Sequence, residues 1–297
     1  DARTFLNRVY TNAWSKLAPG RCRYGLMLNE DGMVMDDGVT SCIADAHFHM
    51  PTPTGGAASV MSWLEDYLQT EWTDLDVRLT SVTEQWAVAS LSGPRTPELM
   101  AALLDDLDPD PEAFSFMSWK PAHIDGVPMR IFRISFTGGV SYEINVAAGH
   151  GAWLWEKIMA AGAPFGITPY GTEAMHLLRA EAGFIIVGQD TDGTVTPVDL
   201  RMEKMVSRAK GDFIGKRSLA RSDTDRAGRR QLVGLLTQDP QAVLAEGAHV
   251  IATADEPAPP VPMLGHVTSS YFSPTLGRSI AMALVKDGGG RMGETLH

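Results

Sequence analysis

Two histidines that lie two residues apart have side chains that can bind a metal ion. His47 and His49 would lie on one face of an extended strand, because successive strand side chains alternate between two faces. An imidazole pair can begin a zinc site, but such sites use three or four protein ligands. Neither a third histidine nor a cysteine follows at a spacing that completes the set. The sequence therefore predicts no metal site.

A glycine-lysine segment has a second pattern that could do chemistry. Residues 211–216 resemble a phosphate-binding loop, but the segment is one residue too short, and Arg217 stands where that loop needs a hydroxyl group for magnesium. No G-x-G-x-x-G run follows a predicted strand, and no G-x-S-x-G nucleophile turn occurs. The sequence thus lacks the fingerprints of a phosphate loop, a dinucleotide-binding fold and a hydrolase nucleophile.

Three longer segments carry a more specific signal when they are taken together. They are residues 24–37, 137–144 and 270–277, with a further match at residues 179–183. In this order and spacing the sequence resembles the aminomethyltransferase family, which comprises the glycine-cleavage T-protein and its folate-binding relatives. The resemblance extends over nearly the whole chain. Residues 169–174 are similar to the branch fused to amine-oxidising flavoproteins, and most similar to the C-terminal region of heterotetrameric sarcosine oxidase alpha subunits.

The resemblance implies a tetrahydrofolate site. Glu143 matches the family's pterin-binding glutamate, and a carboxylate suits the pterin because it accepts two hydrogen bonds from an amide-like donor edge. Asp36 matches the aspartate near the folate nitrogens, where a carboxylate stabilises a developing iminium cation and accepts a proton. Tyr24, Thr52 and Tyr142 are further predicted folate contacts. Asp36 is therefore the predicted catalytic residue, and the other four are the predicted cofactor-binding residues.

The same resemblance implies a reaction and its partners. A flavoprotein partner subunit oxidises an N-methyl amine, sarcosine, to an imine. This chain then captures the one-carbon unit on tetrahydrofolate, which gives methylenetetrahydrofolate and glycine. Flavin and NAD are expected only on partner or missing regions. In one departure from the family, Met175 and His176 occupy the places of an Arg-Asp pair whose arginine helps the T-protein to hold folate.

Two other functions fit the same residues. One is a stand-alone folate-dependent aminomethyltransferase or methyltransferase, and the other is a non-catalytic module that binds folate or assembles subunits. A dinucleotide-binding domain upstream would argue against the first, and an Asp36→Asn variant with unchanged product formation would favour the second. The anionic glutamyl tail of folate would meet a basic patch at Arg208 and Lys210, or would remain in solvent.

The charge and composition limit the partners and the compartment. The chain has 297 residues, of which 25 are basic and 36 are acidic, so that its formal net charge is −11. This imbalance excludes nucleic acid as a partner, because a duplex-binding surface is basic. No apolar stretch reaches the roughly 18 residues of a membrane span, and no leader opens the chain. Cys22 and Cys42 suit a reducing compartment. We predict a soluble, cytoplasmic protein.

Apolar periodicity and turn residues predict the elements that must position these side chains. Helices are expected at residues 4–17, 57–69, 97–107, 151–161 and 172–182. Strands are expected at residues 21–28, 33–35, 76–80, 85–90, 127–136 and 142–146, with a bulge or strand end at residues 36–38, and four short strands are expected after residue 230.

This order of elements predicts an α+β fold, in which antiparallel sheets with packed helices are followed by a small C-terminal β-barrel. We expect an aminomethyltransferase-like folate-binding domain over residues 1–225 and the barrel over residues 226–297. The chain starts inside an apolar helix pattern and stops after a glycine-rich turn. An N-terminal part and a final strand are therefore expected to be missing.

Overall fold

The computed structural model describes residues 1–254 and 259–297, and the chain divides into two compact units. The first unit holds Asp1–Phe5, Lys16–Tyr24 and Val39–Met175, and the second holds Leu6–Ser15, Gly25–Gly38 and His176–His297. Over the described ranges, no helix is long and apolar enough to cross a membrane.

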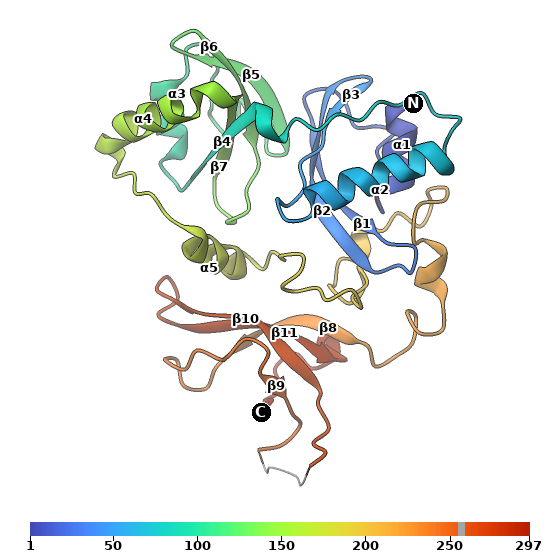
Figure 1. Ribbon diagram of the computed structural model, residues 1–297. Coiled ribbons are helices and arrows are strands. Elements are labelled where there is room, and N and C mark those ends of the chain that lie inside the picture. Colours follow the sequence, from blue (N-terminus) through green and yellow to red (C-terminus); the bar gives the residue numbers. More distant parts are fainter. Residues whose placement is uncertain (255–258) are drawn as a thin grey trace. The chain divides into compact units, whose positions relative to one another are not determined.

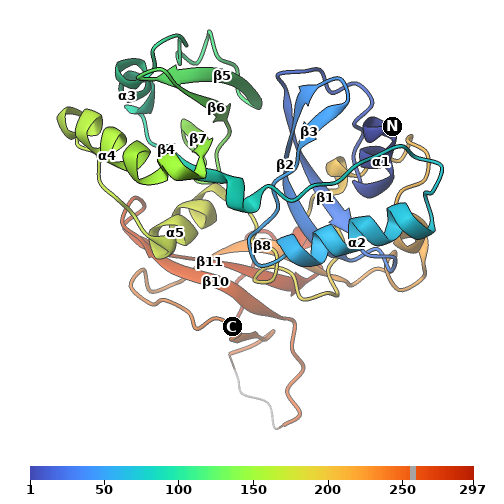
Figure 2. The ribbon, with the colours of Figure 1, turned by 45° about the horizontal axis from the view of Figure 1, so that its top comes forward.

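A four-stranded antiparallel sheet is the centre of the first unit (Figure 1). Its strand order is β4-β7-β6-β5. Helices α3 (Thr96–Leu103) and α4 (Gly151–Gly162) lie on the same face of this sheet (Figure 2), and their apolar side chains form a core with it. The strands are β4 (Trp86–Ser92), β5 (Ser118–Ile124), β6 (Val127–Arg133) and β7 (Ser141–Ala147).

A three-stranded sheet of order β1-β2-β3 precedes it in the chain. Strands β1 and β2 run through both units, since each unit holds part of each strand. The turn between them needs Gly32, which has φ of +84° and donates its N–H to the carbonyl of Asn29. The elements of this part are α1 (Ala2–Val9), β1 (Cys22–Leu28), β2 (Val34–Ala44), β3 (His47–His49) and α2 (Ala57–Thr70).

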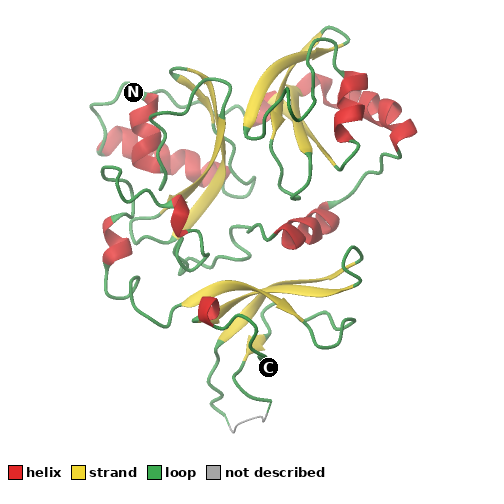
Figure 3. Ribbon diagram, turned by 180° about the vertical axis from the view of Figure 1, so that it is seen from behind, coloured by secondary structure: helices red, strands yellow, loops and turns green. Residues whose placement is uncertain are grey.

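The C-terminal part of the second unit is a four-stranded antiparallel sheet with little helix around it (Figure 3). Its order is β8-β11-β10-β9, and the fully buried Ala283 and Val285 lie on its central strand β11. Helix α5 (Thr172–Ala182) precedes this sheet and ends at Gly183, which has φ of +79°. The strands are β8 (Arg230–Leu236), β9 (His249–Val250), β10 (Gly265–Ser273) and β11 (Arg278–Lys286).

The predicted fold class is confirmed, whereas several predicted elements are wrong. The first helix ends at Val9 rather than at residue 17, because the N–H of Thr11 donates to the carbonyl of Leu26 instead of to a helical carbonyl. Strand β2 continues through residues 36–38, since sheet pairing overrides the low strand propensity of two aspartates. No strand forms at residues 76–80, and strand β5 was not predicted.

Candidate functional site

Glu143 lies on strand β7, and the side chains of this strand alternate between the two faces of the sheet. Tyr142, Ile144 and Val146 point into the core beneath α3 and α4, and all three are fully buried. Glu143 and Asn145 therefore lie on the opposite face, which no helix of the core covers. We call this surface the Glu143 face. Its residues are Glu143, Asn145, their register partners Val88, Ser90, Arg130 and Phe132, and Trp86, which pairs with Ala147 two residues beyond Asn145.

The alternation separates Tyr142 from the other predicted site residues. Its ring lies 5.9 Å from the ring of Phe114, and its hydroxyl donates a hydrogen bond to the carbonyl of Pro109. Burial raises the pKa of this hydroxyl. Tyr142 is thus a core residue that holds β7 in place, and the structure does not bring it to the Glu143 face.

Glu143 has the properties of a carboxylate that receives its hydrogen bonds from a ligand. The side chain is half-buried, and it forms no hydrogen bond or ion pair with any described residue. Burial raises the pKa of Glu143 above its ordinary value of 4.5. A buried carboxylate without donors destabilises the fold, because the protein does not replace its lost hydration. Donors on a bound ligand would supply the missing hydrogen bonds.

Strand β1 brings a buried thiol to the neighbourhood of Glu143. Cys22 packs against Phe132, which lies opposite Glu143 in the β6–β7 register. Burial, together with the charge of Glu143, raises the pKa of Cys22 to about 11, although the hydroxyl of Ser41 donates to its Sγ at 3.1 Å. Tyr24 follows Cys22 by two residues, so both side chains leave β1 on the same side.

Thr52 lies farther along the first unit. It is half-buried in the loop between β3 and α2. Tyr24, Thr52 and Glu143 therefore belong to one unit.

Asp36 belongs to the second unit, where it lies on β2. Its side chain is 3% exposed, and one oxygen accepts a hydrogen bond of 2.7 Å from the backbone N–H of Asp37. Burial raises the pKa of Asp36 to about 6, and the charge of Asp37 adds to this shift, while the hydrogen bond opposes it. Asp36 can therefore exchange a proton near neutral pH, as a general acid or base must.

The sequence did not identify two polar residues of the Glu143 face. Arg130 on β6 lies opposite Asn145 on β7, and its guanidinium carbon is 4.4 Å from the ring centroid of Trp86. Their positions in the alternating strands were a usable signal, since Asn145 follows Glu143 by two residues. The register that sets Arg130 opposite Asn145 was not readable from the sequence.

A histidine adds to the surroundings of Arg130. The ring centroids of His49 and Phe132 are 5.9 Å apart. Burial, with the charges of Arg130 and His47, lowers the pKa of His49 to about 4. His49 is therefore neutral at physiological pH and adds no charge beside Arg130.

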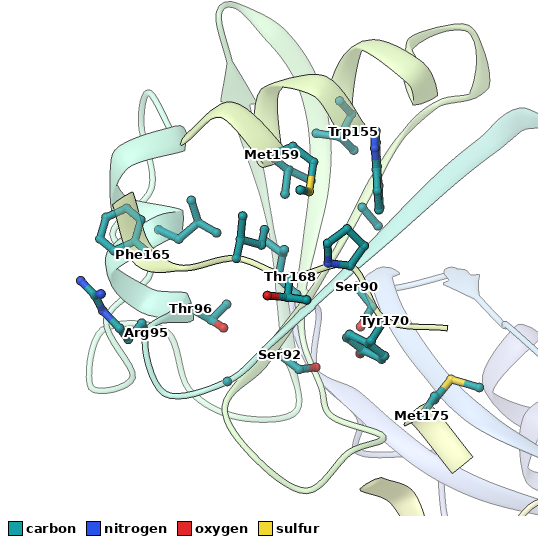
Figure 4. Close-up of a pocket in the computed structure, with 18 of the residues that line it drawn as sticks. Ser90, Ser92, Arg95, Thr96, Trp155, Met159, Phe165, Thr168, Tyr170 and Met175 are labelled. Carbon is teal, nitrogen blue, oxygen red and sulfur yellow. The ribbon is translucent and has the colours of Figure 1, made fainter. Parts of the chain in front are cut away.

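A cavity of about 770 Å³ runs along β4 in the same unit (Figure 4). Its lining includes Ser90 and Ser92 from β4, Trp155 from α4 and Tyr170 from the segment that follows α4. Ser90 is the register partner of Glu143, but no described carboxylate lines the cavity itself. The cavity offers aromatic and hydroxyl contacts, whereas the charged acceptor lies on the Glu143 face.

Lys210, which the sequence suggested for the glutamyl tail of folate, is engaged within its own unit. Its ammonium group donates to the carbonyls of Tyr10 and Asn12 and lies 4.6 Å from the ring centroid of Phe213. Burial and the charge of Lys216 lower its pKa to about 7. Arg208 is exposed. The two residues therefore do not form the basic patch that we expected.

Comparisons with known proteins show which proteins the chain resembles. The model of the GCVT N-terminal domain matches residues 1–210, and that of the glycine cleavage T-protein C-terminal barrel domain matches residues 230–297. The sarcosine oxidase alpha subunit of Corynebacterium sp. (strain P-1) is 54% identical over all of this chain, which spans 31% of that subunit's length. The aminomethyltransferase of Streptomyces coelicolor is 31% identical, with 96% of this chain and 73% of that protein covered.

A solved structure shows the same fold. The glycine cleavage system aminomethyltransferase T from Bartonella henselae superimposes with a TM-score of 0.81 at 24% identity, over 96% of this chain and 73% of that one. The match covers both the helix-covered sheet and the C-terminal sheet.

Proposed function

Because this chain belongs to the glycine cleavage T-protein family, we propose that it binds tetrahydrofolate and transfers a one-carbon unit to it. The observation that carries the proposal is the half-buried carboxylate of Glu143, which has no hydrogen-bond partner among the described residues. The pterin ring presents adjacent N–H donors on one edge, and these suit the two oxygens of a carboxylate. Glu143 fits this group, and Tyr24 and Thr52 are the further proposed contacts.

Glu143 would bind and orient the ligand rather than react with it. Its two oxygens would accept hydrogen bonds from the donor edge and fix the ring in one orientation, which makes the transfer effectively intramolecular. When bound, tetrahydrofolate supplies the nitrogens that take up the carbon. The hydrogen bonds would also offset the cost of the buried charge of Glu143.

Asp36 is the proposed catalytic residue. As a carboxylate it would stabilise the positive charge of an iminium substrate and accept the proton that is released. With its pKa at about 6, Asp36 is mostly ionised at neutral pH and still basic enough to take a proton. The chemistry would depend on this group and not on a covalent nucleophile of the protein.

The finer proposal is the branch of the family. The identity of 54% to a sarcosine oxidase alpha subunit supports a role as the folate-binding part of such an enzyme. A cytoplasmic location is part of the same proposal. A flavoprotein partner would oxidise sarcosine to its imine, and this chain would capture the carbon, so that glycine and methylenetetrahydrofolate leave. Flavin and NAD would bind to regions other than this chain.

Calorimetric titration of the chain with tetrahydrofolate tests the site. We expect Glu143→Ala to weaken binding about tenfold to a hundredfold, because a hydrogen bond to a charged group contributes roughly 1.5–3 kcal/mol. Glu156→Gln is a matched control, since Glu156 is an exposed acidic residue on α4 of the same unit. An unchanged affinity for Glu143→Ala would show that the pterin binds elsewhere.

A stand-alone aminomethyltransferase is the second candidate, and one observation favours it. The aminomethyltransferase of Streptomyces coelicolor is matched over 73% of its own length, whereas the sarcosine oxidase subunit is matched over 31%. Met175 and His176, in the places of an Arg-Asp pair of the T-protein, argue against strict T-protein activity, and residues 169–174 resemble the sarcosine oxidase branch. Carbon transfer from an aminomethyl carrier without a flavoprotein would favour the stand-alone enzyme.

A further inference from the structure

Arg130 is a cation that the described part of the chain leaves without an anion. Its guanidinium is half-buried and stacks on Trp86, with 4.4 Å between Cζ and the ring centroid. It forms no hydrogen bond and no ion pair with a described residue. The ring fixes the guanidinium in place but does not satisfy its five N–H donors. The loss of hydration lowers the pKa of Arg130, because burial destabilises the charged form of the guanidinium.

Asn145 adds a second unsatisfied group at the same place. It lies directly opposite Arg130 in the β6–β7 register, so both side chains share the Glu143 face. The residue is only 4% exposed, and its Oδ1 is buried without a hydrogen-bond partner. An amide can turn over and present either its oxygen or its NH₂ group at one position. Buried polar groups are normally paired in the folded chain, so an unpaired amide beside an unpaired cation indicates a ligand.

The position relative to Glu143 limits what this ligand can be. Glu143 and Asn145 are two residues apart on β7, which places their backbones roughly 7 Å apart along the strand. Arg130 and Glu143 do not pair with each other. The face therefore offers an acceptor for N–H donors at one end and donors for an anion at the other.

We propose that Arg130 and Asn145 form a carboxylate subsite beside Glu143, an inference that rests on the proposed function. A guanidinium binds a carboxylate through paired hydrogen bonds, and the amide NH₂ would add a third donor. Two sources carry such a group: the glutamyl tail of folate, and the amino acid that leaves when its N-methylene carbon is transferred. The contact with the ring of Trp86 holds the guanidinium in place for this ligand.

Calorimetry with three probes distinguishes the two sources. Tetrahydrofolate carries both the pterin and the tail carboxylates, 6-methyltetrahydropterin carries the pterin alone, and glycine carries the amino-acid carboxylate alone. We expect Arg130→Met to lower the affinity for the probe whose carboxylate binds at the subsite by tenfold or more. The affinity for 6-methyltetrahydropterin should equal that of the wild type. If the variant loses affinity for tetrahydrofolate, the subsite binds the glutamyl tail. If it loses affinity for glycine, the subsite binds the carboxylate of the amino acid.

Two further variants make the result specific. Arg130→Lys keeps the charge without the planar fork, and it should recover part of the lost affinity. Arg78→Met removes an exposed arginine of the same unit, which forms an ion pair with the exposed Asp76, and should change none of the three titrations. Thermal unfolding of Arg130→Met checks that the variant is folded.

The outcomes separate this inference from the proposed function. If Arg130→Met binds all three probes as wild type does, or weakens 6-methyltetrahydropterin as much as tetrahydrofolate, the carboxylate subsite is wrong and the folate site stands. If the wild type binds neither pterin compound, the proposed function is wrong. A wild type that binds none of the three probes overturns both.

Discussion

Two polar clusters of this molecule use the same kinds of side chain but differ in how they are satisfied. In the second unit, Nη1 of the fully buried Arg179 donates to Asp190, and Nη2 donates to Ser269. Asp190 also accepts a hydrogen bond from Thr268. On the Glu143 face of the first unit, an arginine, an amide and a carboxylate have no such partners among the described residues.

The difference separates a structural role from a binding role. A chain that folds stably pairs the polar groups that it buries, because each unpaired group costs free energy. The Arg179 cluster follows this rule for both Nη atoms of the guanidinium, although its buried Nε has no hydrogen-bond partner among the described residues, and the cluster links α5 to the C-terminal sheet. The Glu143 face does not follow it, because three neighbouring polar groups are unpaired among the described residues. Unpaired buried polar groups occur mainly at binding and catalytic sites, where a ligand supplies the missing hydrogen bonds.

The largest expected effect tests the paired cluster. Asp190→Ala should lower the free energy of unfolding by about 3–5 kcal/mol, because it leaves the charge of Arg179 buried without its partner. Urea unfolding measures this loss. Asp225→Ala is the matched control, since Asp225 is exposed in the same unit and should change stability by less than about 0.5 kcal/mol. A loss below about 1 kcal/mol for Asp190→Ala would remove the contrast between the clusters.

Asp36 sharpens the comparison, because it is buried with one backbone hydrogen bond and so lies between the two extremes. Asp36→Asn should lower the rate of carbon transfer about a hundredfold, in the range of general base catalysis. In the wild type the rate should rise with pH and reach half its maximum near pH 6, since the active form is the carboxylate. The asparagine variant should lack this rise.

Asp37→Asn provides the control for Asp36. It keeps the backbone N–H that Asp36 accepts from, but removes a charge that raises the pKa of Asp36. The midpoint should therefore move to lower pH while the maximal rate is preserved. The measurement is the initial rate of carbon transfer from sarcosine by the protein with its flavoprotein partner, between pH 5 and pH 8. A midpoint that does not move would assign the titration to another group.

The sequence allowed the fold class and single strands to be predicted, because these depend on local periodicity. Helix α2 and the turn at Gly32 follow from apolar spacing and from a residue that accepts positive φ. Strand β7 was predicted for the same reason. Strand β5 was missed because Lys120 and Pro121 obscure its alternation, and a proline is tolerated there on an edge strand.

The candidate site could be predicted only in part. The family resemblance suggested Glu143 and Asp36, but strict alternation on β7 places Tyr142 in the core and not beside Glu143. Arg130 and Asn145 were missed because their proximity comes from the register between β6 and β7, which local periodicity does not determine. Local patterns show which way a side chain points, whereas strand pairing decides what it meets.

The smallest expected effect tests whether Glu143 is retained for a ligand rather than for the fold. Glu143→Gln should raise the free energy of unfolding by about 1 kcal/mol at neutral pH, because it removes a buried charge that no described residue compensates. The raised pKa fixes the sign of the pH dependence. The contribution of Glu143 to wild-type stability is highest below the unfolded pKa of 4.5 and falls as pH rises towards the folded pKa, since the folded state holds this proton more tightly. The advantage of the glutamine variant should therefore vanish in acid and grow above pH 4.5.

Urea unfolding from pH 4 to pH 8 measures the stability of both proteins, and the control variant Glu156→Gln should show no such trend. Lower stability of Glu143→Gln at pH 7 would mean that the carboxylate supports the fold, and the contrast with Asp190 would then be lost.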